Sequence, residues 1–133
     1  MLLQENRLRK MKDFDILWKE GRFVTGTLAN AKVWQLQPEK YPRRAYTAAD
    51  LRFGFVVSTK ISKSAVKRNR IKRQMREVVR LLLKDGRIKF GFHIAIIAKS
   101  EMLGKEYEEI ERSLAELLRR SGVMIELKGI KQN

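Results

Sequence analysis

Residues 63–80 read Lys-Ser-Ala-Val-Lys-Arg-Asn-Arg-Ile-Lys-Arg-Gln-Met-Arg-Glu-Val-Val-Arg, a basic run that also contains a regular apolar stripe. At about 100° per residue, one face of a helix collects Ile71, Met75, Val78 and Leu82, with Val79 at its edge. The opposite arc, about 100° wide in the same projection, carries Asn69, Lys72, Arg73, Arg76 and Arg80. The pattern predicts a helix over residues 64–84 that buries one face and presents cations on the other.

This row of cations is typical of a surface that binds phosphate groups. Arg outnumbers Lys in the row, and a guanidinium group can bond two phosphate oxygens at once. A helix face that only contacts solvent normally mixes signs, because like charges one turn apart cost stability. Glu77 is the only acid between Ala65 and Arg80, and its heptad spacing predicts that it orients Arg70. We therefore expect this face to bind a polyanion.

The whole chain is strongly basic. Its 133 residues include 30 Lys and Arg against 15 Asp and Glu, a formal net charge of +15, and 44% are hydrophobic. The apolar content is enough for the core of one domain, and the charge favours RNA or DNA as the partner. The absence of Cys excludes disulfides and thiolate metal sites. No segment has the apolar length of a signal peptide or a membrane span, so we expect a cytoplasmic protein without membrane contact.

The remaining sequence predicts strands and two further helices around the basic helix. Residues 12–20 form a short helix that ends at Gly21, and residues 37–50 read as a connecting loop. The predicted strands span residues 28–36, 52–58 and 92–98, and the last helix begins near Tyr107 and ends before Gly122. We divide the single domain into a basic arm (1–10), a core (11–122) and a C-terminal tail (123–133).

The sequence contains no recognisable catalytic constellation. His93 is the only histidine, and a lone histidine in a predicted strand is more often a packed side chain than a base. With no Cys and no second His, it cannot join a zinc site. The last helix starts with Glu106, Glu108, Glu109 and Glu111, whose charges match the helix dipole. We predict no catalytic residue and no metal site, which indicates a binding protein.

The run from Lys60 to Arg73 reads Lys-Ile-Ser-Lys-Ser-Ala-Val-Lys-Arg-Asn-Arg-Ile-Lys-Arg and continues to Arg76-Glu77. It resembles the Arg-Asn-Arg signature of the protein component of bacterial ribonuclease P. Further blocks resemble the first helix, the second and third strands and the last helix of that family: Leu8, Asp13-Phe14, Gly21, residues 52–58, 94–99 and 107–120. The resemblance covers residues 7–121.

Three features depart from the family pattern. Many family members have Gly where Ser62 stands, and an acidic residue is common where His93 stands. The connection over residues 37–50 is also long. None of these departures changes the basic face of the predicted helix.

The resemblance implies a small α/β domain of two layers, in which a mixed sheet packs against helices (ribosomal protein S5 domain 2-like). The basic helix would form a left-handed βαβ crossover, whereas general experience predicts a right-handed one. The implied function is to assist a large catalytic RNA that removes the 5′ leader from precursor tRNA. The RNA and the substrate would hold the Mg2+ ions. The implied partners are ribonuclease P RNA, with one protein per RNA, and precursor tRNA.

The resemblance also implies two RNA-binding surfaces. The surface for the catalytic RNA would comprise Lys63, Lys67, Arg68, Asn69, Arg70, Lys72, Arg73, Arg76 and Arg80. The cleft for the precursor leader would comprise Phe14, Trp18, Lys32, Trp34 and Arg52. Aromatic rings stack on bases without sequence preference, and nearby cations neutralise phosphates. Core packing is the alternative for the aromatic residues of this cleft, and we expect it for the neighbouring Leu17.

Two other functions are compatible with a basic, folded chain. A ribosomal or RNA-chaperone-type structural protein would share the basic face but would lack the leader cleft. A self-sufficient nuclease would need the catalytic constellation that the sequence lacks. The RNA that copurifies with the protein discriminates among these functions.

Overall fold

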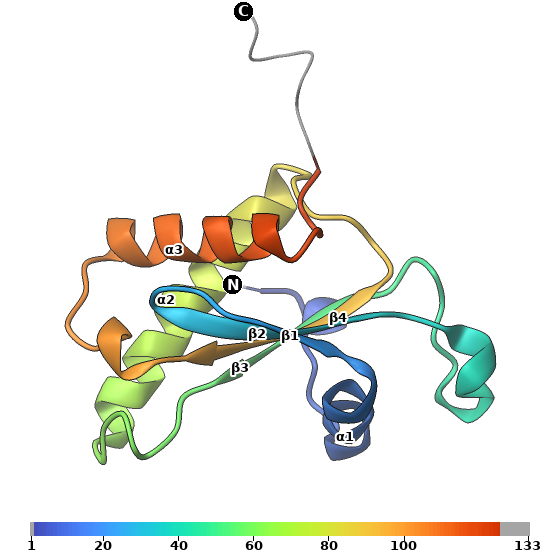
Figure 1. Ribbon diagram of the computed structural model, residues 1–133, viewed down its shortest axis with the longest axis horizontal. Helices are drawn as coiled ribbons and strands as arrows, with labels where there is room; N and C mark the ends of the chain where they lie inside the picture. Colours follow the sequence, from blue (N-terminus) through green and yellow to red (C-terminus); the bar gives the residue numbers. More distant parts are fainter. Residues whose placement is uncertain (1, 126–133) are drawn as a thin grey trace, which may run out of the picture.

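The computed structural model describes residues 2–125, in which a four-stranded sheet lies between helices on both of its faces (Figure 1). Among the described residues, no helix is long and apolar enough to span a membrane. The elements in chain order are η1 (Gln4–Asn6), α1 (Met11–Glu20), β1 (Arg22–Val24), β2 (Ala29–Gln35), η2 (Pro38–Lys40), η3 (Pro42–Arg44), β3 (Leu51–Val56), α2 (Ala65–Lys84), β4 (Phe92–Ala98), η4 (Ser100–Met102) and α3 (Tyr107–Arg120), where η marks a 3-10 turn.

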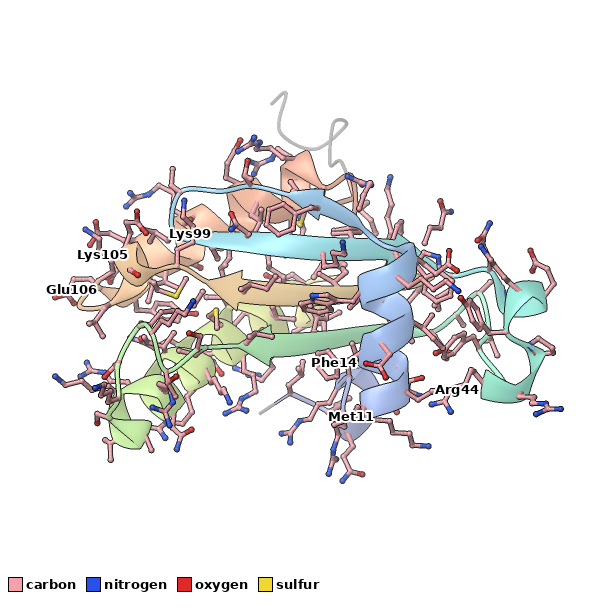
Figure 2. All side chains as sticks on the ribbon, turned by 60° about the horizontal axis from the view of Figure 1, so that its bottom comes forward. Met11, Phe14, Arg44, Lys99, Lys105 and Glu106 are labelled. Carbon is pink, nitrogen blue, oxygen red and sulfur yellow. The ribbon has the colours of Figure 1, made fainter. Side chains whose placement is uncertain are left out.

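The sheet is mixed, with the strand order β1-β2-β4-β3. Strands β1 and β2, and β2 and β4, are antiparallel, while β3 and β4 are parallel. Helix α2 connects these two parallel strands, and the crossover is left-handed, as the resemblance implied (Figures 1 and 2). Helices α2 and α3 cover one face of the sheet and α1 lies on the other (Figure 1).

Helix α2 forms where the sequence predicted it. The side chain of Ser64 caps its first turn by accepting a hydrogen bond from the Lys67 amide (3.3 Å). Ser62 replaces the common Gly without a left-handed backbone, and its hydroxyl accepts a hydrogen bond from the Ser64 amide (3.1 Å). The helix ends before Gly86, which adopts a positive φ of 67°. Its predicted apolar face is buried at Ile71, Met75, Val78 and Val79, with Leu82 partly buried.

The alternation of side chains along the strands produces two cores, one on each face of the sheet. The larger core joins the sheet to α2 and α3 and includes Phe53 and Ile94. The smaller core joins the sheet to α1 and includes Leu17, Trp34 and Tyr46. Leu17 is fully buried, as expected. The basic helix and α1 are therefore fixed on opposite sides of one rigid sheet.

Both ends of the described chain belong to the packed domain. The expected N-terminal arm runs beside β3, where Arg7 bridges to Phe53 and the Leu8 amide donates to the Phe53 carbonyl (2.8 Å). Leu8 is buried. Met124 pairs with Ile88 and is also buried, so the core extends beyond the predicted boundary at residue 122. Residues 126–133 of the expected tail lie outside the described part.

Candidate RNA interface

The predicted basic residues of α2 and of the turn before it form one surface, which we call the basic face. Five of its members are exposed: Lys63, Lys67, Asn69, Arg70 and Arg73. Four are partly buried: Arg68, Lys72, Arg76 and Arg80. Because the buried stripe of α2 points into the larger core, the helix cannot turn these cations away from solvent.

Two residues of the basic face are engaged within the protein. Arg68 donates from Nη1 to the carbonyl of Ser62 (2.8 Å), which ties the start of α2 to the preceding turn. Glu77 accepts two hydrogen bonds from Arg80, at 3.0 Å from Nε and 2.7 Å from Nη2. The prediction that Glu77 orients Arg70 is therefore wrong, because the neighbour three residues along the helix takes both carboxylate oxygens.

The N-terminal arm adds a cation to the basic face. Arg7 lines a pocket of about 350 Å³ together with Arg73 and Arg76 of α2. Burial lowers the pKa of Arg76, and the positive charges of Arg7 and Arg73 lower it further. Among the residues that the structure describes, the only acid lining this pocket is Glu77, which already binds Arg80. Three guanidinium groups held together in this way attract an anion. Helical periodicity gave no sign of Arg7, because that residue lies outside α2.

The other side of the sheet is only partly covered by α1 (Figure 2). We call the uncovered part the open face. The strand register places Phe23, Lys32, Ala95 and Gly54 in one row across the sheet and Asn30, Ile97 and Val56 in the next. Lys32 is partly exposed, and Phe23 is 55% exposed. Sequence reasoning missed Phe23, because a three-residue strand is too short to show alternation.

Phe14 and Trp18 lie on the flank of α1 that borders the open face. Phe14 is partly buried and rests directly on Gly54, where an added Cβ would lie 2.4 Å from its Cζ atom. Trp18 is 45% exposed and its ring centroid lies 6.2 Å from that of Phe14. Figure 2 shows Phe14 pointing over the sheet from this flank of α1. Two aromatic side chains thus border a sheet surface that carries Lys32.

The structure buries Trp34 but leaves Arg52 partly exposed on the same face of the sheet. Trp34 is only 5% exposed, because Tyr41 and Tyr46 from the connection after β2 pack edge-on against it at centroid distances of 5.7 and 5.8 Å. The prediction that Trp34 lines the leader cleft is therefore wrong. Arg52 is partly buried and shares a row with His93 and Trp34, one row away from Lys32.

His93 lies in the smaller core with no exposed surface. Within residues 2–125 neither ring nitrogen has a hydrogen-bond partner, and the ring of Tyr46 packs edge-on against the imidazole at a centroid distance of 4.9 Å. Burial lowers the pKa of His93 to about 4, so the imidazole is neutral at pH 7. A side chain enclosed in this way cannot reach a substrate, in agreement with the packed role predicted for it.

Asp13 anchors α1 to the connection after β2. Its Oδ1 atom accepts hydrogen bonds from Arg44 (2.7 Å from Nη2) and from the hydroxyl of Tyr46 (2.6 Å). Burial raises the pKa of this carboxyl group, but the hydrogen bonds from Tyr46 and Arg44 outweigh burial and lower the pKa below its usual value. Burial and the bond to Asp13 raise the pKa of Tyr46 to about 12. The ion pair fixes one flank of α1.

The acidic residues do not converge on a metal site. In the described range 2–125, no group of three or more His, Asp or Glu side chains could hold a metal ion. Glu106 and Glu109 instead form a reciprocal cap at the start of α3, where the Glu109 carboxylate accepts a hydrogen bond from the Glu106 amide (3.4 Å). These glutamates stabilise the helix terminus, as the sequence predicted.

Comparison with known proteins shows the family to which this fold belongs. The family model for ribonuclease P matches residues 2–122, which is most of the chain. The chain belongs to the bacterial ribonuclease P protein family. Proteins of this family are components of an endoribonuclease that processes tRNA as a ribonucleoprotein. Membership in the family implies partnership with ribonuclease P RNA.

Individual ribonuclease P proteins match over nearly their whole length. The protein component from a Pseudanabaena species is 33% identical over 124 residues, covering 93% of this chain and 97% of that protein. The 2.0 Å structure of the Staphylococcus aureus ribonuclease P protein has a TM-score of 0.72 and 25% identity, covering 90% of this chain and 98% of the other. The Thermotoga maritima protein has a TM-score of 0.67 and 28% identity, covering 86% and 96%. The sequence relatives and the solved structures with a similar fold therefore belong to the same family.

Proposed function

We propose that the protein uses both sides of its sheet to bind two RNAs at once. The basic face of α2 docks on ribonuclease P RNA, in a complex of one protein per RNA. The open face, bordered by Phe14 and Trp18, binds the single-stranded 5′ leader of precursor tRNA. The RNA subunit and the substrate hold the Mg2+ ions and carry out the hydrolysis. We expect this complex to form in the cytoplasm.

One observation supports this proposal above all: the two surfaces lie on opposite sides of the sheet. Helix α2 packs into the larger core and α1 into the smaller one, so neither RNA would block the other. The two surfaces also differ in chemistry. The basic face is rich in Arg, which suits the phosphates of a folded RNA. The open face combines aromatic edges with Lys32, which suits a flexible strand whose bases can stack.

The proposed leader surface differs by one exchange from the one that the sequence implied. It keeps Phe14, Trp18, Lys32 and Arg52 and gains Phe23, because the register places it in the row of Lys32. Trp34 is excluded by burial. No specific observation favours a ribosomal or RNA-chaperone role over this one.

The experiment compares precursor and mature tRNA as ligands of the assembled complex at saturating protein. Phe14→Ala should weaken precursor binding by about 1–3 kcal/mol, the range for loss of one stacked base, while mature tRNA binds as before. Phe90→Ala is the matched control, because Phe90 is an exposed phenylalanine outside the open face (69%). Equal losses for both tRNAs, or a loss that follows thermal unfolding, would show that Phe14 only supports the fold.

A further inference from the structure

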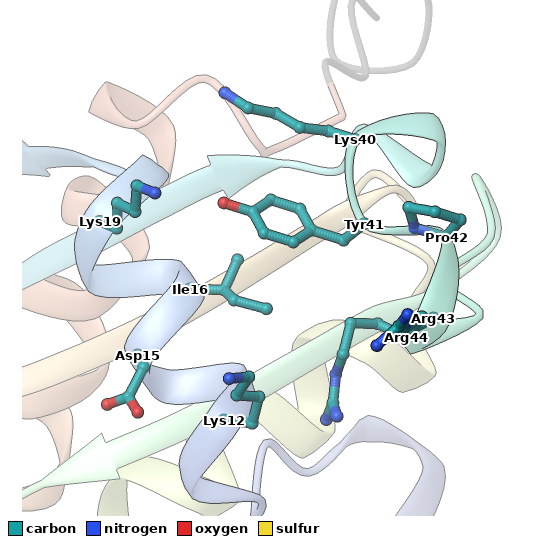
Figure 3. A pocket seen from close by; sticks show the side chains of 9 residues that line it. All are labelled: Lys12, Asp15, Ile16, Lys19, Lys40, Tyr41, Pro42, Arg43 and Arg44. Carbon is teal, nitrogen blue, oxygen red and sulfur yellow. The ribbon is translucent and has the colours of Figure 1, made fainter.

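A pocket of about 520 Å³ lies on the other flank of α1, between this helix and the long connection after β2 (Figure 3). Its volume is in the range of small-molecule sites, about 300–1,000 Å³, and is large enough for one nucleotide. Figure 2 shows Arg44, one of its wall residues, on the side of α1 away from Phe14. The pocket is lined by Lys12, Asp15, Ile16, Lys19, Lys40, Tyr41, Pro42, Arg43 and Arg44.

The floor of this pocket is apolar and held in place. Tyr41 extends from the connection toward α1 and faces Ile16 (Figure 3). The hydroxyl of Tyr41 donates to Glu20 at the end of α1, and its ring packs edge-on against Trp34. Pro42, which has a restricted backbone, completes the floor. A planar group placed here would meet a preformed aromatic and aliphatic surface, so little ordering would oppose its binding.

The rim of the pocket carries cations that the protein does not neutralise. Lys40 pairs with Glu20 (3.0 Å) and Arg44 pairs with Asp13 (2.7 Å), so these two cations already have acidic partners within the protein. The remaining rim cations, Lys12, Lys19 and Arg43, form no side-chain hydrogen bond or ion pair within residues 2–125, and Asp15 is the one acid of the rim. These features fit a ligand that has a flat ring and a phosphate: the ring would lie on the apolar floor, and the phosphate would meet the three cations without an acidic partner in the described range.

From this combination we infer that the pocket binds one nucleotide of the same precursor leader that lies on the open face, so that the strand crosses α1. This inference rests on the function proposed above. Viewed down α1, Phe14 and Trp18 point to one flank and Ile16 to the other, with Lys12, Asp15 and Lys19 on the outward side between them. A helix is about 10–12 Å across, which a few nucleotides of single strand can span. The cations on the outward side of α1 would neutralise phosphates of the strand where it crosses this helix.

A series of precursors with leaders shortened one nucleotide at a time tests this path. Affinity for the assembled complex should rise with leader length in two stages, first when the open face is filled and again when the pocket is reached. The double variant Lys12→Ala/Arg43→Ala should keep the first stage and lose the second. Its salt slope for the longest leader should fall by about 1.4, the value for two phosphate contacts on a single strand, and should not change for the shortest leader.

The control is Arg112→Ala/Arg120→Ala, which removes the same charge from exposed positions on α3, on the opposite side of the sheet. This variant should keep both stages. Equal losses for every leader length and for mature tRNA would mean that the pocket contacts the tRNA body, and weaker assembly would mean that it contacts ribonuclease P RNA. Either result, or two intact stages in the Lys12/Arg43 variant, overturns the inference. If the first rise in affinity is absent, or if Phe14→Ala leaves it unchanged, the result would instead contradict the proposed leader surface.

Discussion

The ring of Phe14 lies directly on the backbone of Gly54, so close that an added Cβ would be 2.4 Å from Cζ and 2.6 Å from Cε1. Position 54 thus has to lack a side chain for Phe14 to keep this place at the border of the open face. The contact joins α1 to β3 and sets the height of the aromatic edge above the sheet.

Gly54→Ala should displace the ring of Phe14 without unfolding the protein. The clashing atoms are at the far end of a side chain that can swing toward solvent, so the cost should be about 1 kcal/mol, at the low end for overpacking. Precursor affinity should fall as it does in Phe14→Ala, with no further loss in the double variant. Urea unfolding and tRNA binding measure the two effects. Additive losses in precursor affinity would show that Gly54 and Phe14 act independently.

Stability should depend on pH through His93. Its pKa is about 4 in the folded protein, against about 6.5 when unfolded, so the unfolded chain binds more protons between these values. Above pH 6.5, His93 is neutral in both states and does not lower the free energy of unfolding. As pH falls from 6.5 toward 4, the free energy of unfolding decreases by about 3 kcal/mol in total. Denaturant unfolding from pH 7 to pH 4 measures this loss. His93→Phe should flatten the curve in this window, and an unchanged curve would assign the pH dependence to other groups.

Binding to ribonuclease P RNA should weaken steeply with salt. With about five phosphate contacts, log affinity should fall against log salt with a slope of about −4. Arg73→Ala should reduce the steepness by about one. Arg80→Ala should reduce it less, because its guanidinium already binds Glu77. Titrations over a range of monovalent salt at fixed Mg2+ give the slopes. Equal slopes for the wild type and for Arg70, Arg73 and Arg76 variants would disprove docking through α2.

The two tryptophans should respond differently to truncation. Trp34→Ala removes a buried ring and should cost about 3–5 kcal/mol of unfolding free energy, whereas Trp18→Ala should cost about 1 kcal/mol or less because that ring is half exposed. Conversely, Trp18→Ala should lower the preference of the complex for precursor over mature tRNA. A stable Trp34→Ala variant with weakened precursor binding would return Trp34 to the leader surface.

Periodicity predicted the parts of the fold that have a long, regular pattern. Helix α2 and strand β4 were predicted from the chain alone, because their apolar spacing persists over several turns or alternations. The position of Trp34 could not be predicted in this way. Its covering residues, Tyr41 and Tyr46, come from a connection without periodicity, and only the folded chain brings them onto β2.

The candidate RNA surfaces were likewise predictable only where a local sequence pattern carries them. The row of cations on α2 was visible in the sequence because one helix carries it. Arg7 and Phe23 were missed, since each joins its surface through pairing of backbone segments that are distant in sequence or very short. The left-handed crossover also had no local signal, and only the family resemblance implied it.

The arm that runs beside β3 affects how this protein behaves before it meets RNA. An uncovered edge strand offers unpaired amides and carbonyls to the edge of any other sheet, which invites aggregation. Here the Leu8 amide already occupies the Phe53 carbonyl, and the opposite edge of the sheet is the three-residue strand β1. The arm therefore covers part of this edge at residues 7 and 8 and leaves less free backbone there for the sheet of a second copy to pair with.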